Sequence, residues 1–307
     1  MEYDVVIVGS GAAGLSAALY AGRYKLKTLV IEGKFGGETA TAGVIWNYPG
    51  VKNVDGYDLM KTMKQQAKDV GVEFMDGLVE KITRADKNFI VSTKKKEVLA
   101  KSVILAIGAK RRHLNLPNEA ELTGKGVHYC VTCDGPLFGG KTIAMVGGGD
   151  SSVKGINFLA DYAAKIYFIV RDNKITAEPI NREQMDKLGD RVEILFETAI
   201  KEIVGKDMLE KVLLSRPYKG SEELMLDGLF IEIGFDPDKT FANQLDLRLN
   251  PQGYMEVDNL MQTNVSGIFA AGDATLLFGG FKQDITAAAL GAVAATSAYE
   301  YIKKIAS

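Results

Sequence analysis

Two stretches of the chain carry the same succession of apolar and polar positions. Residues Asp4–Glu32 align without gaps with Thr142–Val170. In each stretch a strand of consecutive apolar residues leads into a glycine-rich turn, a helix and a second strand. Uninterrupted apolar strands are typical of parallel sheets that are covered on both faces. The repeat predicts two βαβ units, with helices and second strands at Leu15–Tyr24 and Thr28–Glu32, and at Val153–Ala163 and Lys165–Val170.

The similarity continues beyond the two units. Each unit is followed by three β-rich runs and then by a strand that ends in Ile-Gly. Runs of this kind, separated by short polar turns, predict a β-meander. The predicted strands are Leu78–Thr83, Asn88–Ser92, Glu97–Lys101 and Val103–Gly108 after the first unit, and Val192–Val204, Leu209–Ser215, Glu222–Leu226 and Leu229–Gly234 after the second.

A last apolar strand within Ser266–Asp273 precedes an alanine-rich helix at Thr286–Tyr301 and has no counterpart after the first repeat. We expect it to return to the first domain, which then comprises residues 1–115 and 246–307. The second domain, residues 116–245, is inserted through polar linkers near Arg111–Glu119 and Asp236–Leu245, each containing proline. The predicted fold class is α/β, with two Rossmann-like three-layer dinucleotide-binding domains, each with a β-meander, the second inserted in the first.

Composition limits the classes of partner. The chain has 307 residues, 47% hydrophobic and 25% charged, which suffices for two buried cores. A formal net charge of −2 lacks the basic surplus of proteins that bind nucleic acid or anionic membranes. With only two His and two Cys we expect no metal site. No signal-peptide pattern opens the chain, and charges end the apolar stretch Ala287–Ala298 too early for a membrane span, so we expect a cytoplasmic protein.

The first glycine-rich turn has the spacing Gly9-x-Gly11-x-x-Gly14, between a strand and a helix. Glycines at these positions let backbone N–H groups and the helix N-terminus approach a pyrophosphate. Glu32 ends the next strand, where a carboxylate can accept hydrogen bonds from both ribose hydroxyls and disfavours a 2′-phosphate. In this context the motif predicts a bound dinucleotide rather than an empty turn.

The second turn is a weaker copy. It reads Gly147-Gly148-Gly149, with Ser152 where the third glycine would stand. Val170 takes the place of the ribose-binding carboxylate, and Arg171 lies beside it. Taken alone, this pattern favours a nicotinamide dinucleotide with a 2′-phosphate. The alternative is a vestigial duplicate that binds nothing.

Both cysteines of the chain fall in the motif Cys130-Val131-Thr132-Cys133. In a reducing compartment such a pair most often alternates between dithiol and disulfide. Asp134 follows directly and is a candidate proton donor or acceptor for a thiolate, or a cap for a helix or turn. His128 is interpreted as a polar residue beside the motif, with nothing adjacent to orient it as a base.

Two dinucleotide sites and one dithiol predict an electron relay. A nicotinamide gives up two electrons as a hydride, and a disulfide accepts two. A flavin accepts from the first and reduces the second, which makes it the natural intermediate carrier.

With these features the chain resembles the low-molecular-weight thioredoxin reductases, over essentially its whole length. The matching segments are Gly9–Gly14 with Glu32, Gly36-Gly37-Glu38-Thr39 leading to Asn47-Tyr48-Pro49-Gly50, Ala106-Ile107-Gly108, Cys130-Val131-Thr132-Cys133-Asp134-Gly135, and Gly272-Asp273 with Lys282-Gln283. The resemblance implies FAD at Gly9, Ser10, Gly11, Ala12, Ala13, Gly14, Glu32, Gly36, Gly37, Glu38, Thr39, Asn47, Val79, Ala106, Gly108, Gly272, Asp273, Lys282 and Gln283. It implies NADPH or NADH at Gly147, Gly148, Gly149, Asp150, Ser151, Arg171 and Lys174.

The resemblance also implies roles for the redox motif. Cys133 would lie nearer the flavin, Cys130 would attack the disulfide of thioredoxin, and Asp134 would be the acid–base residue. Members of the family are homodimers, and they rotate one domain against the other because nicotinamide and disulfide use the same flavin face in turn.

One segment departs from the family pattern of three arginines that bind NADPH. Arg171 retains the first arginine, but the second is replaced by Asp172 and the third by Thr176. Two cations that would bind a 2′-phosphate are therefore missing, and Lys174 replaces them only in part. We predict a weak preference for NADPH, with NADH or another donor in its place.

Three alternatives to a thioredoxin reductase remain open. A flavoprotein of the same fold that passes electrons to ferredoxin or a quinone has no need of the cysteine pair. A reductase of another disulfide partner, such as a peroxiredoxin, a glutaredoxin-like protein or a small disulfide, would have the same motifs. The most distant alternative is a non-catalytic redox sensor that signals through Cys130 and Cys133.

Overall fold

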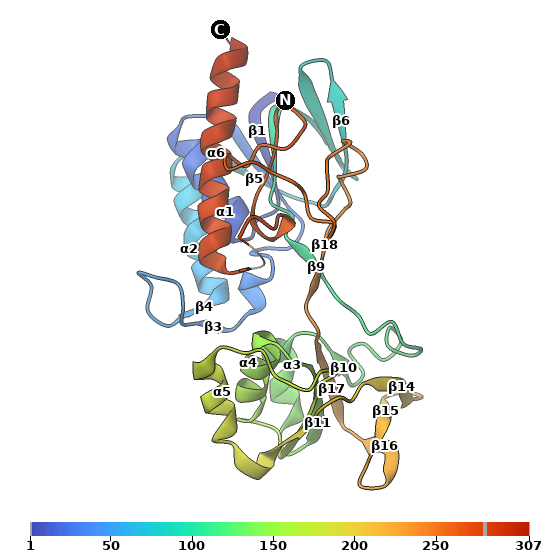
Figure 1. The fold of residues 1–307 in the computed structure, drawn as a ribbon. Helices are drawn as coiled ribbons and strands as arrows, with labels where there is room; N and C mark the ends of the chain where they lie inside the picture. The colour runs from blue at the N-terminus through green and yellow to red at the C-terminus, as the bar shows by residue number, and fades with distance from the viewer. Residues whose placement is uncertain (1, 279–280, 307) are drawn as a thin grey trace. The chain divides into compact units, whose positions relative to one another are not determined.

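A computed structural model describes residues 2–278 and 281–306 (Figure 1). The chain divides into two compact units, one formed by Met1–Lys110 with Pro237–Ser307 and the other by Arg111–Asp236. The chain leaves and re-enters the first unit through β9 (Ala109–Arg111) and β18 (Phe235–Pro237), which pair with each other. Among the described residues, no helix is both long enough and apolar enough to span a membrane.

The first unit contains a seven-stranded sheet in which β5-β2-β1-β8-β7-β6 are neighbours and β19 also pairs with β8. The pairs among β1, β2, β5, β8 and β19 are parallel, and β6-β7-β8 form an antiparallel meander. The elements are β1 (Glu2–Val8), α1 (Ala12–Arg23), β2 (Thr28–Glu32), β3 (Val44–Ile45), β4 (Val54–Asp55), α2 (Gly56–Asp69), β5 (Glu73–Asp76), β6 (Val79–Ala85), β7 (Asn88–Thr93), β8 (Glu97–Leu105), β19 (Ile268–Ala270) and α6 (Asp284–Ala306).

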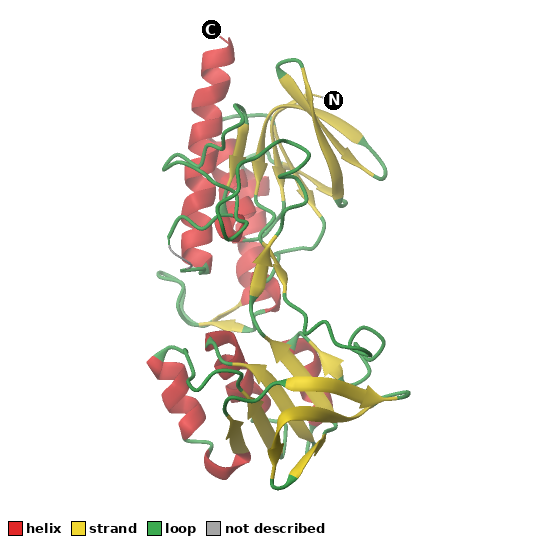
Figure 2. Cartoon of the chain, turned by 45° about the vertical axis from the view of Figure 1, so that its right-hand side comes forward, coloured by secondary structure: helices red, strands yellow, loops and turns green. Residues whose placement is uncertain are grey.

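The second unit repeats the parallel core with a five-stranded sheet, β10-β17-β11-β12-β13. Helices cover one face of this sheet, and the antiparallel sheet β14-β15-β16 covers the other, as Figure 2 shows. The elements are β10 (Val127–His128), α3 (Val131–Asp134), β11 (Thr142–Gly147), α4 (Asp150–Leu159), β12 (Lys165–Ile169), α5 (Pro179–Asp186), β13 (Val192–Leu195), β14 (Ile200–Gly205), β15 (Leu209–Tyr218), β16 (Ser221–Met225) and β17 (Gly228–Glu232).

Two of the predicted runs are divided differently in the structure, and β5, which lies at one edge of the first sheet, was not predicted. The run Glu97–Lys101 and the first part of the run Val103–Gly108 are one continuous strand, β8, which ends at Leu105. Ser102 between them is buried, and its hydroxyl donates to the Asp4 carbonyl oxygen at 3.0 Å. The single run Val192–Val204 divides into β13 and β14, which belong to different sheets. Glu197 between them has a φ of 51°, and this left-handed residue turns the chain out of the parallel sheet.

Close helix packing in the first unit depends on small residues. Helices α1 and α6 pack against each other and against the parallel sheet, with Ala17, Ala18 and Ala294 wholly buried. Gly291 lies at the contact, where an added Cβ would stand 2.0 Å from the backbone oxygen of Ala13. That oxygen belongs to the first turn of α1, so the close approach of α6 holds in place the helix that follows the first glycine loop.

We therefore predict that Gly291→Ala destabilises the protein. In an ordinary helix this change gains about 1 kcal/mol. Here the overlap with backbone exceeds that gain, and the free energy of unfolding falls by about 1–3 kcal/mol. Urea unfolding measures the change. The control is Ala289→Gly at an exposed position of the same helix, which should lower the free energy of unfolding by about 1 kcal/mol through helix propensity alone. A Gly291→Ala variant more stable than the wild type would contradict the packing described.

Candidate functional site

The first glycine loop connects β1 to α1 in a conformation that only glycine permits. Gly9 has a φ of 105°, and a Cβ there would stand 2.3 Å from the Ala106 carbonyl oxygen. A Cβ on Gly14 would stand 2.0 Å from the Gly9 carbonyl oxygen. Helix α1 starts after Gly11 with no side-chain cap, so its first N–H groups point to the space over the loop. This arrangement fits a bound pyrophosphate.

Glu32 is a buried residue with one side-chain oxygen that is bonded to Lys64 and a second that differs from it. The residue is 5% exposed, and its Oε1 forms an ion pair with Lys64 of α2. Within the described part of the chain, Oε2 has no hydrogen-bond partner. An unsatisfied buried acceptor costs about 1–3 kcal/mol, which a ligand hydroxyl removes by donating to it. Glu32 thus fits the ribose of a dinucleotide, as predicted from its position; Lys64 was not predicted, because nothing in its spacing relates it to Glu32.

Other predicted residues of the first unit are joined by hydrogen bonds between distant segments. The Thr39 hydroxyl donates to Asp284 at 2.6 Å, and Asn47 Nδ2 donates to Gln283 Oε1 at 3.0 Å. The segment after β2 is thereby attached to the start of α6. The remaining predicted positions lie on the loops around β1, β2 and β8 or at the ends of their neighbours: Ser10, Ala12, Ala13, Gly36, Gly37, Glu38, Val79 and Gly108.

A cleft that is open to solvent is lined by Gly272, Asp273, Lys282 and the N-terminal residues of α6. Burial raises the pKa of Asp273 above its ordinary value, the charge of Asp284 adds to this, and Lys282 opposes it. Lys282 Nζ lies 4.0 Å from the ring centroid of Tyr254. All four segments that the resemblance assigns to FAD lie in the first unit.

The second glycine loop forms a similar tight turn, which a serine hydrogen bond stabilises. Gly147 has a φ of 156°, and a Cβ there would stand 2.3 Å from the Glu232 carbonyl oxygen. Ser152, in place of the third glycine, is wholly buried and its hydroxyl donates to that same oxygen at 2.9 Å. Gly148 and Gly149 precede α4 and leave the backbone there uncovered by side chains of their own. The loop thus retains a geometry that fits a pyrophosphate.

Asp150 at the start of α4 is fully engaged by protein groups. Its Oδ1 accepts from the Glu178 N–H at 3.0 Å and from Asn181 Nδ2 at 2.8 Å, and its Oδ2 lies 2.8 Å from Lys154 Nζ. Burial alone would raise the pKa of Asp150, but these bonds outweigh it and hold the pKa below its ordinary value. The carboxylate fixes the segment before α5, while its neighbour Ser151 is exposed.

The ribose end of this second site lacks a cation cluster. Arg171 is 85% exposed, and its Nε lies 3.7 Å from Oδ1 of Asp172, which occupies the position of a family arginine. The hydroxyl of Thr176 contacts the Gly148 carbonyl oxygen at 3.3 Å, and Lys174 is exposed. The residues fit a dinucleotide backbone but not tight binding of a 2′-phosphate.

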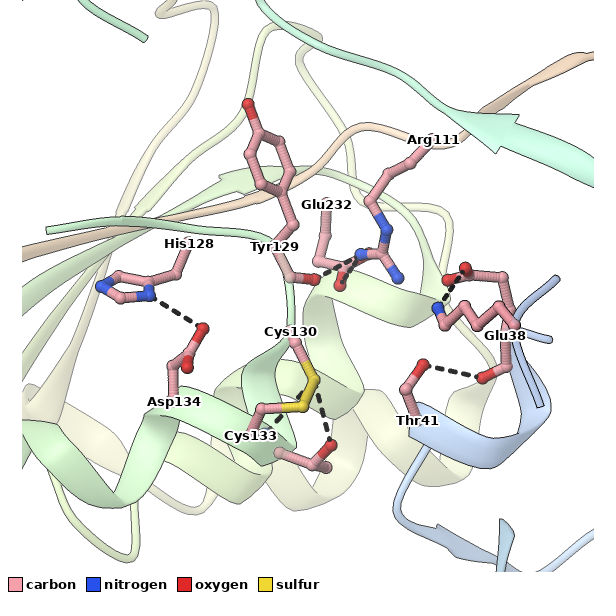
Figure 3. The surroundings of a disulfide bond; sticks show 11 residues. Glu38, Thr41, Arg111, His128, Tyr129, Cys130, Cys133, Asp134 and Glu232 are labelled. Atoms are coloured by element: carbon pink, nitrogen blue, oxygen red, sulfur yellow. Dashed lines mark hydrogen bonds and ion pairs between the residues drawn. A yellow bond between two sulfur atoms is a disulfide. The ribbon is translucent and has the colours of Figure 1, made fainter. Parts of the chain in front are cut away.

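The two cysteines form a disulfide at α3. Cys130 caps the helix: its Sγ accepts from the Cys133 N–H at 3.3 Å, and the Thr132 hydroxyl lies 3.6 Å from the same sulfur (Figure 3). An N–H that points at Sγ favours a thiolate there when the disulfide opens. The pair is thus built as a reversible dithiol–disulfide couple on a short, fixed helix.

His128 lies within hydrogen-bond distance of the residue that follows the motif. Its Nδ1 is 2.8 Å from Asp134 Oδ2, and Figure 3 shows the carboxylate turned toward the imidazole. The prediction that nothing orients His128 was wrong, because Asp134 at the end of α3 lies against the imidazole of His128 in β10. Asp134 makes no side-chain cap of the turn that follows, so the capping interpretation is not observed.

A second network supports the strand before the cysteines. Arg111 Nη1 donates to the Tyr129 carbonyl oxygen at 2.5 Å and to Glu232 Oε1 at 2.7 Å. The Tyr129 hydroxyl donates to Glu119. Burial and this bond raise the pKa of Tyr129. Burial would also raise the pKa of Glu119, but the hydrogen bonds from Tyr129 and from backbone N–H groups hold that pKa below its ordinary value. Sequence spacing gave no signal for this network.

The described residues contain no cluster of three or more His, Cys, Asp or Glu that could hold a metal ion. Two dinucleotide-type loops and one reversible disulfide define instead an oxidoreductase that exchanges electrons between dinucleotide cofactors and a dithiol. The chain belongs to the pyridine nucleotide-disulphide oxidoreductases, whose family model matches residues 3–295, and within them to the low-molecular-weight thioredoxin reductases. Its cofactors are therefore a flavin and a pyridine nucleotide.

Similar proteins cover nearly the whole chain. A thioredoxin reductase of Peptoclostridium acidaminophilum is 39% identical over 311 residues, covering 98% of this chain and 97% of that protein. The crystal structure of Lactococcus lactis thioredoxin reductase (FR conformation) has a TM-score of 0.92 and 34% identity, covering 98% and 99% of the two chains. A ferredoxin-flavin thioredoxin reductase of Clostridium acetobutylicum has a TM-score of 0.54 and 31% identity, covering 100% and 99%.

We predict that Glu32→Gln weakens flavin binding at least tenfold. The amide replaces one acceptor oxygen by a donor, and a hydrogen bond to a charged group contributes about 1.5–3 kcal/mol. Flavin fluorescence released on dilution measures the affinity. Asp76→Asn is the matched control, because Asp76 is paired with Glu32 across the sheet but is exposed; equal affinity in the Glu32 variant would refute the role given to the buried oxygen.

Proposed function

We propose that the protein is a thioredoxin-disulfide reductase that binds FAD and passes two electrons through Cys130 and Cys133 to oxidised thioredoxin. The observation that carries this proposal is the disulfide between the only two cysteines, in a unit with its own dinucleotide loop. A two-electron carrier and a two-electron acceptor are thereby combined in one chain. Full-length similarity to proteins named thioredoxin reductase supports thioredoxin as the partner.

FAD is assigned to the first unit. The Gly9–Gly14 loop would receive the pyrophosphate and Glu32 the adenosine ribose, with Asp273 and Lys282 at the cleft that precedes α6. When bound, the flavin supplies the electron pair that opens the disulfide. Following the family resemblance, we assign Cys130 as the nucleophile toward thioredoxin, Cys133 as the sulfur nearer the flavin, and Asp134 as the acid–base group. We also propose a cytoplasmic homodimer.

The electron donor is proposed to be NADH or a protein rather than NADPH. Arg171 lies beside Asp172, so the one arginine retained in this segment is partly neutralised where a 2′-phosphate would bind. The position that Glu32 has in the first unit is taken here by Val170, which is buried. This position therefore offers no carboxylate to bind an unphosphorylated ribose. A reduced ferredoxin is the second candidate, favoured by the similarity to the Clostridium acetobutylicum protein whose name includes ferredoxin.

The donor is identified by anaerobic bleaching of the flavin with NADPH, NADH and reduced ferredoxin. We expect at most a weak NADPH preference in the wild-type protein. The double variant Asp172→Arg, Thr176→Arg restores two cations and raises kcat/KM for NADPH by tenfold or more, with little change for NADH. Lys187→Arg, a cation-preserving change outside this segment, is the control. A strong NADPH preference in the wild-type protein would contradict this assignment.

Thioredoxin reduction is tested with the donor that bleaches the flavin. Oxidised thioredoxin should be turned over by the wild-type enzyme, whereas Cys130→Ser and Cys133→Ser retain flavin reduction and lose at least 99% of thioredoxin reduction, because neither can form the disulfide. If both serine variants still reduced thioredoxin, the proposed relay would be wrong. If the wild-type protein reduced only another disulfide, the partner alone would be reassigned.

A further inference from the structure

The imidazole of His128 is held rigidly beside the redox motif. The residue is 6% exposed. Its ring stacks on Phe230 with centroids 5.4 Å apart and meets the edge of Phe138 at 5.2 Å. Two aromatic contacts and a strand backbone leave the ring little freedom to turn. A histidine buried among phenylalanines in this way has its polar edge fixed in one direction.

That polar edge faces the carboxylate of Asp134. The distance from Nδ1 to Oδ2 is 2.8 Å, and the Asp134 side chain remains 31% exposed. Asp134 follows Cys133 directly, and its N–H donates to the Cys130 carbonyl oxygen at 3.1 Å. One oxygen of the carboxyl group is therefore bound to a buried imidazole, and the side chain that follows the redox motif remains partly exposed.

The remaining charged groups on the elements packed around this pair have partners of their own. On β17 and the residue before it, Glu232 is paired with Arg111 at 2.7 Å and Asp227 with Lys141 at 3.5 Å. On α4, which packs against α3, Asp150 is paired with Lys154 at 2.8 Å. The electrostatic partner of Asp134 is thus His128.

We propose that His128 is a positioning residue for Asp134, which orients its carboxyl group and shares the proton moved when the Cys130–Cys133 couple changes state. The inference rests on the proposed function, in which Asp134 is the acid–base group. Imidazole suits this task because its charge ordinarily changes near neutral pH and its Nδ1 can either donate or accept.

The step balances within the reaction of the reduced protein with a disulfide. The Cys130 thiolate attacks one partner sulfur and breaks the partner's S–S bond, and the first partner thiolate takes the proton given up by the Cys130 thiol. Cys133 yields its proton to the Asp134–His128 pair and attacks Cys130 Sγ, which reforms the internal disulfide and expels the second partner sulfur. The pair returns the proton to that sulfur. Two electrons and two protons reach the partner.

Two substitutions separate the proton from the hydrogen bond. His128→Asn places an amide Nδ2 near the position of Nδ1, so it still donates to Asp134 but does not titrate. His128→Phe keeps an aromatic ring between Phe138 and Phe230 without a donor. The control is His113→Asn, which removes the other histidine of the chain; His113 lies 2.8 Å from the Tyr129 hydroxyl and is not bonded to Asp134.

The measurement is the stopped-flow rate at which the prereduced holoenzyme is oxidised by excess thioredoxin disulfide, between pH 5.5 and 9 in steps of about 0.5, spanning the ordinary range of histidine. His128→Phe should be slower by about tenfold or more at pH 7, part of the 10²–10⁴-fold typical of acid–base catalysis. His128→Asn should recover most of that loss while the pH dependence near neutrality disappears. His113→Asn should follow the wild type.

Wild-type rates and pH profiles in both His128 variants, with flavin content intact, would overturn the proposal. Equal losses in the Asn and Phe variants would also overturn it, because a retained donor would then make no difference. The same series run with a small aromatic disulfide measures the same proton transfer without thioredoxin. If the wild-type protein failed to reduce thioredoxin but reduced the small disulfide, thioredoxin would be refuted as the partner. The comparison of the His128 variants with the small disulfide would still test the role of His128.

Discussion

One sulfur–sulfur bond, between Cys130 and Cys133, determines what this protein can do. The chain offers no other cysteine and two histidines in total, so chemistry that requires thiols must pass through this pair. A disulfide opens only when it receives two electrons and when protons are supplied to the sulfurs that separate. The proposed function meets these two demands with the two dinucleotide-type loops for the electrons and the carboxyl group of Asp134 beside the motif for the proton.

The same backbone solution is used twice for the electrons. Both loops follow a buried parallel strand, and both begin with a left-handed or extended glycine whose Cβ would collide with a carbonyl oxygen of a neighbouring strand. They differ at the ribose. In the first unit Glu32 offers a buried oxygen that has no partner among residues 2–278 and 281–306, whereas Arg171 and Asp172 in the second lie side by side on the surface. The first site fits a ribose, and we propose that the second, with Asp172 and Thr176 where the resemblance implies arginines, has little preference for a 2′-phosphate.

Much of this was predictable because local chemistry leaves few options. A glycine that must be glycine, the only cysteine pair, and an aspartate in place of an arginine are each visible in the sequence. The pairs Glu32–Lys64, His128–Asp134 and Arg111–Tyr129 were not, since each joins segments whose contact depends on tertiary packing. The division of Val192–Val204 into two sheets depended likewise on one left-handed residue, Glu197. Pattern indicates which elements exist, and packing decides which side chains meet.

The account depends most directly on electrons reaching the sulfurs, and an anaerobic reductive titration with dithionite measures this. With FAD bound, the protein should consume about four electrons per chain, two for the flavin and two for the disulfide. Alkylation followed by mass spectrometry should then label both Cys130 and Cys133, which are unlabelled beforehand. Full bleaching of the flavin after about two electrons, with both cysteines still unlabelled, would contradict the account.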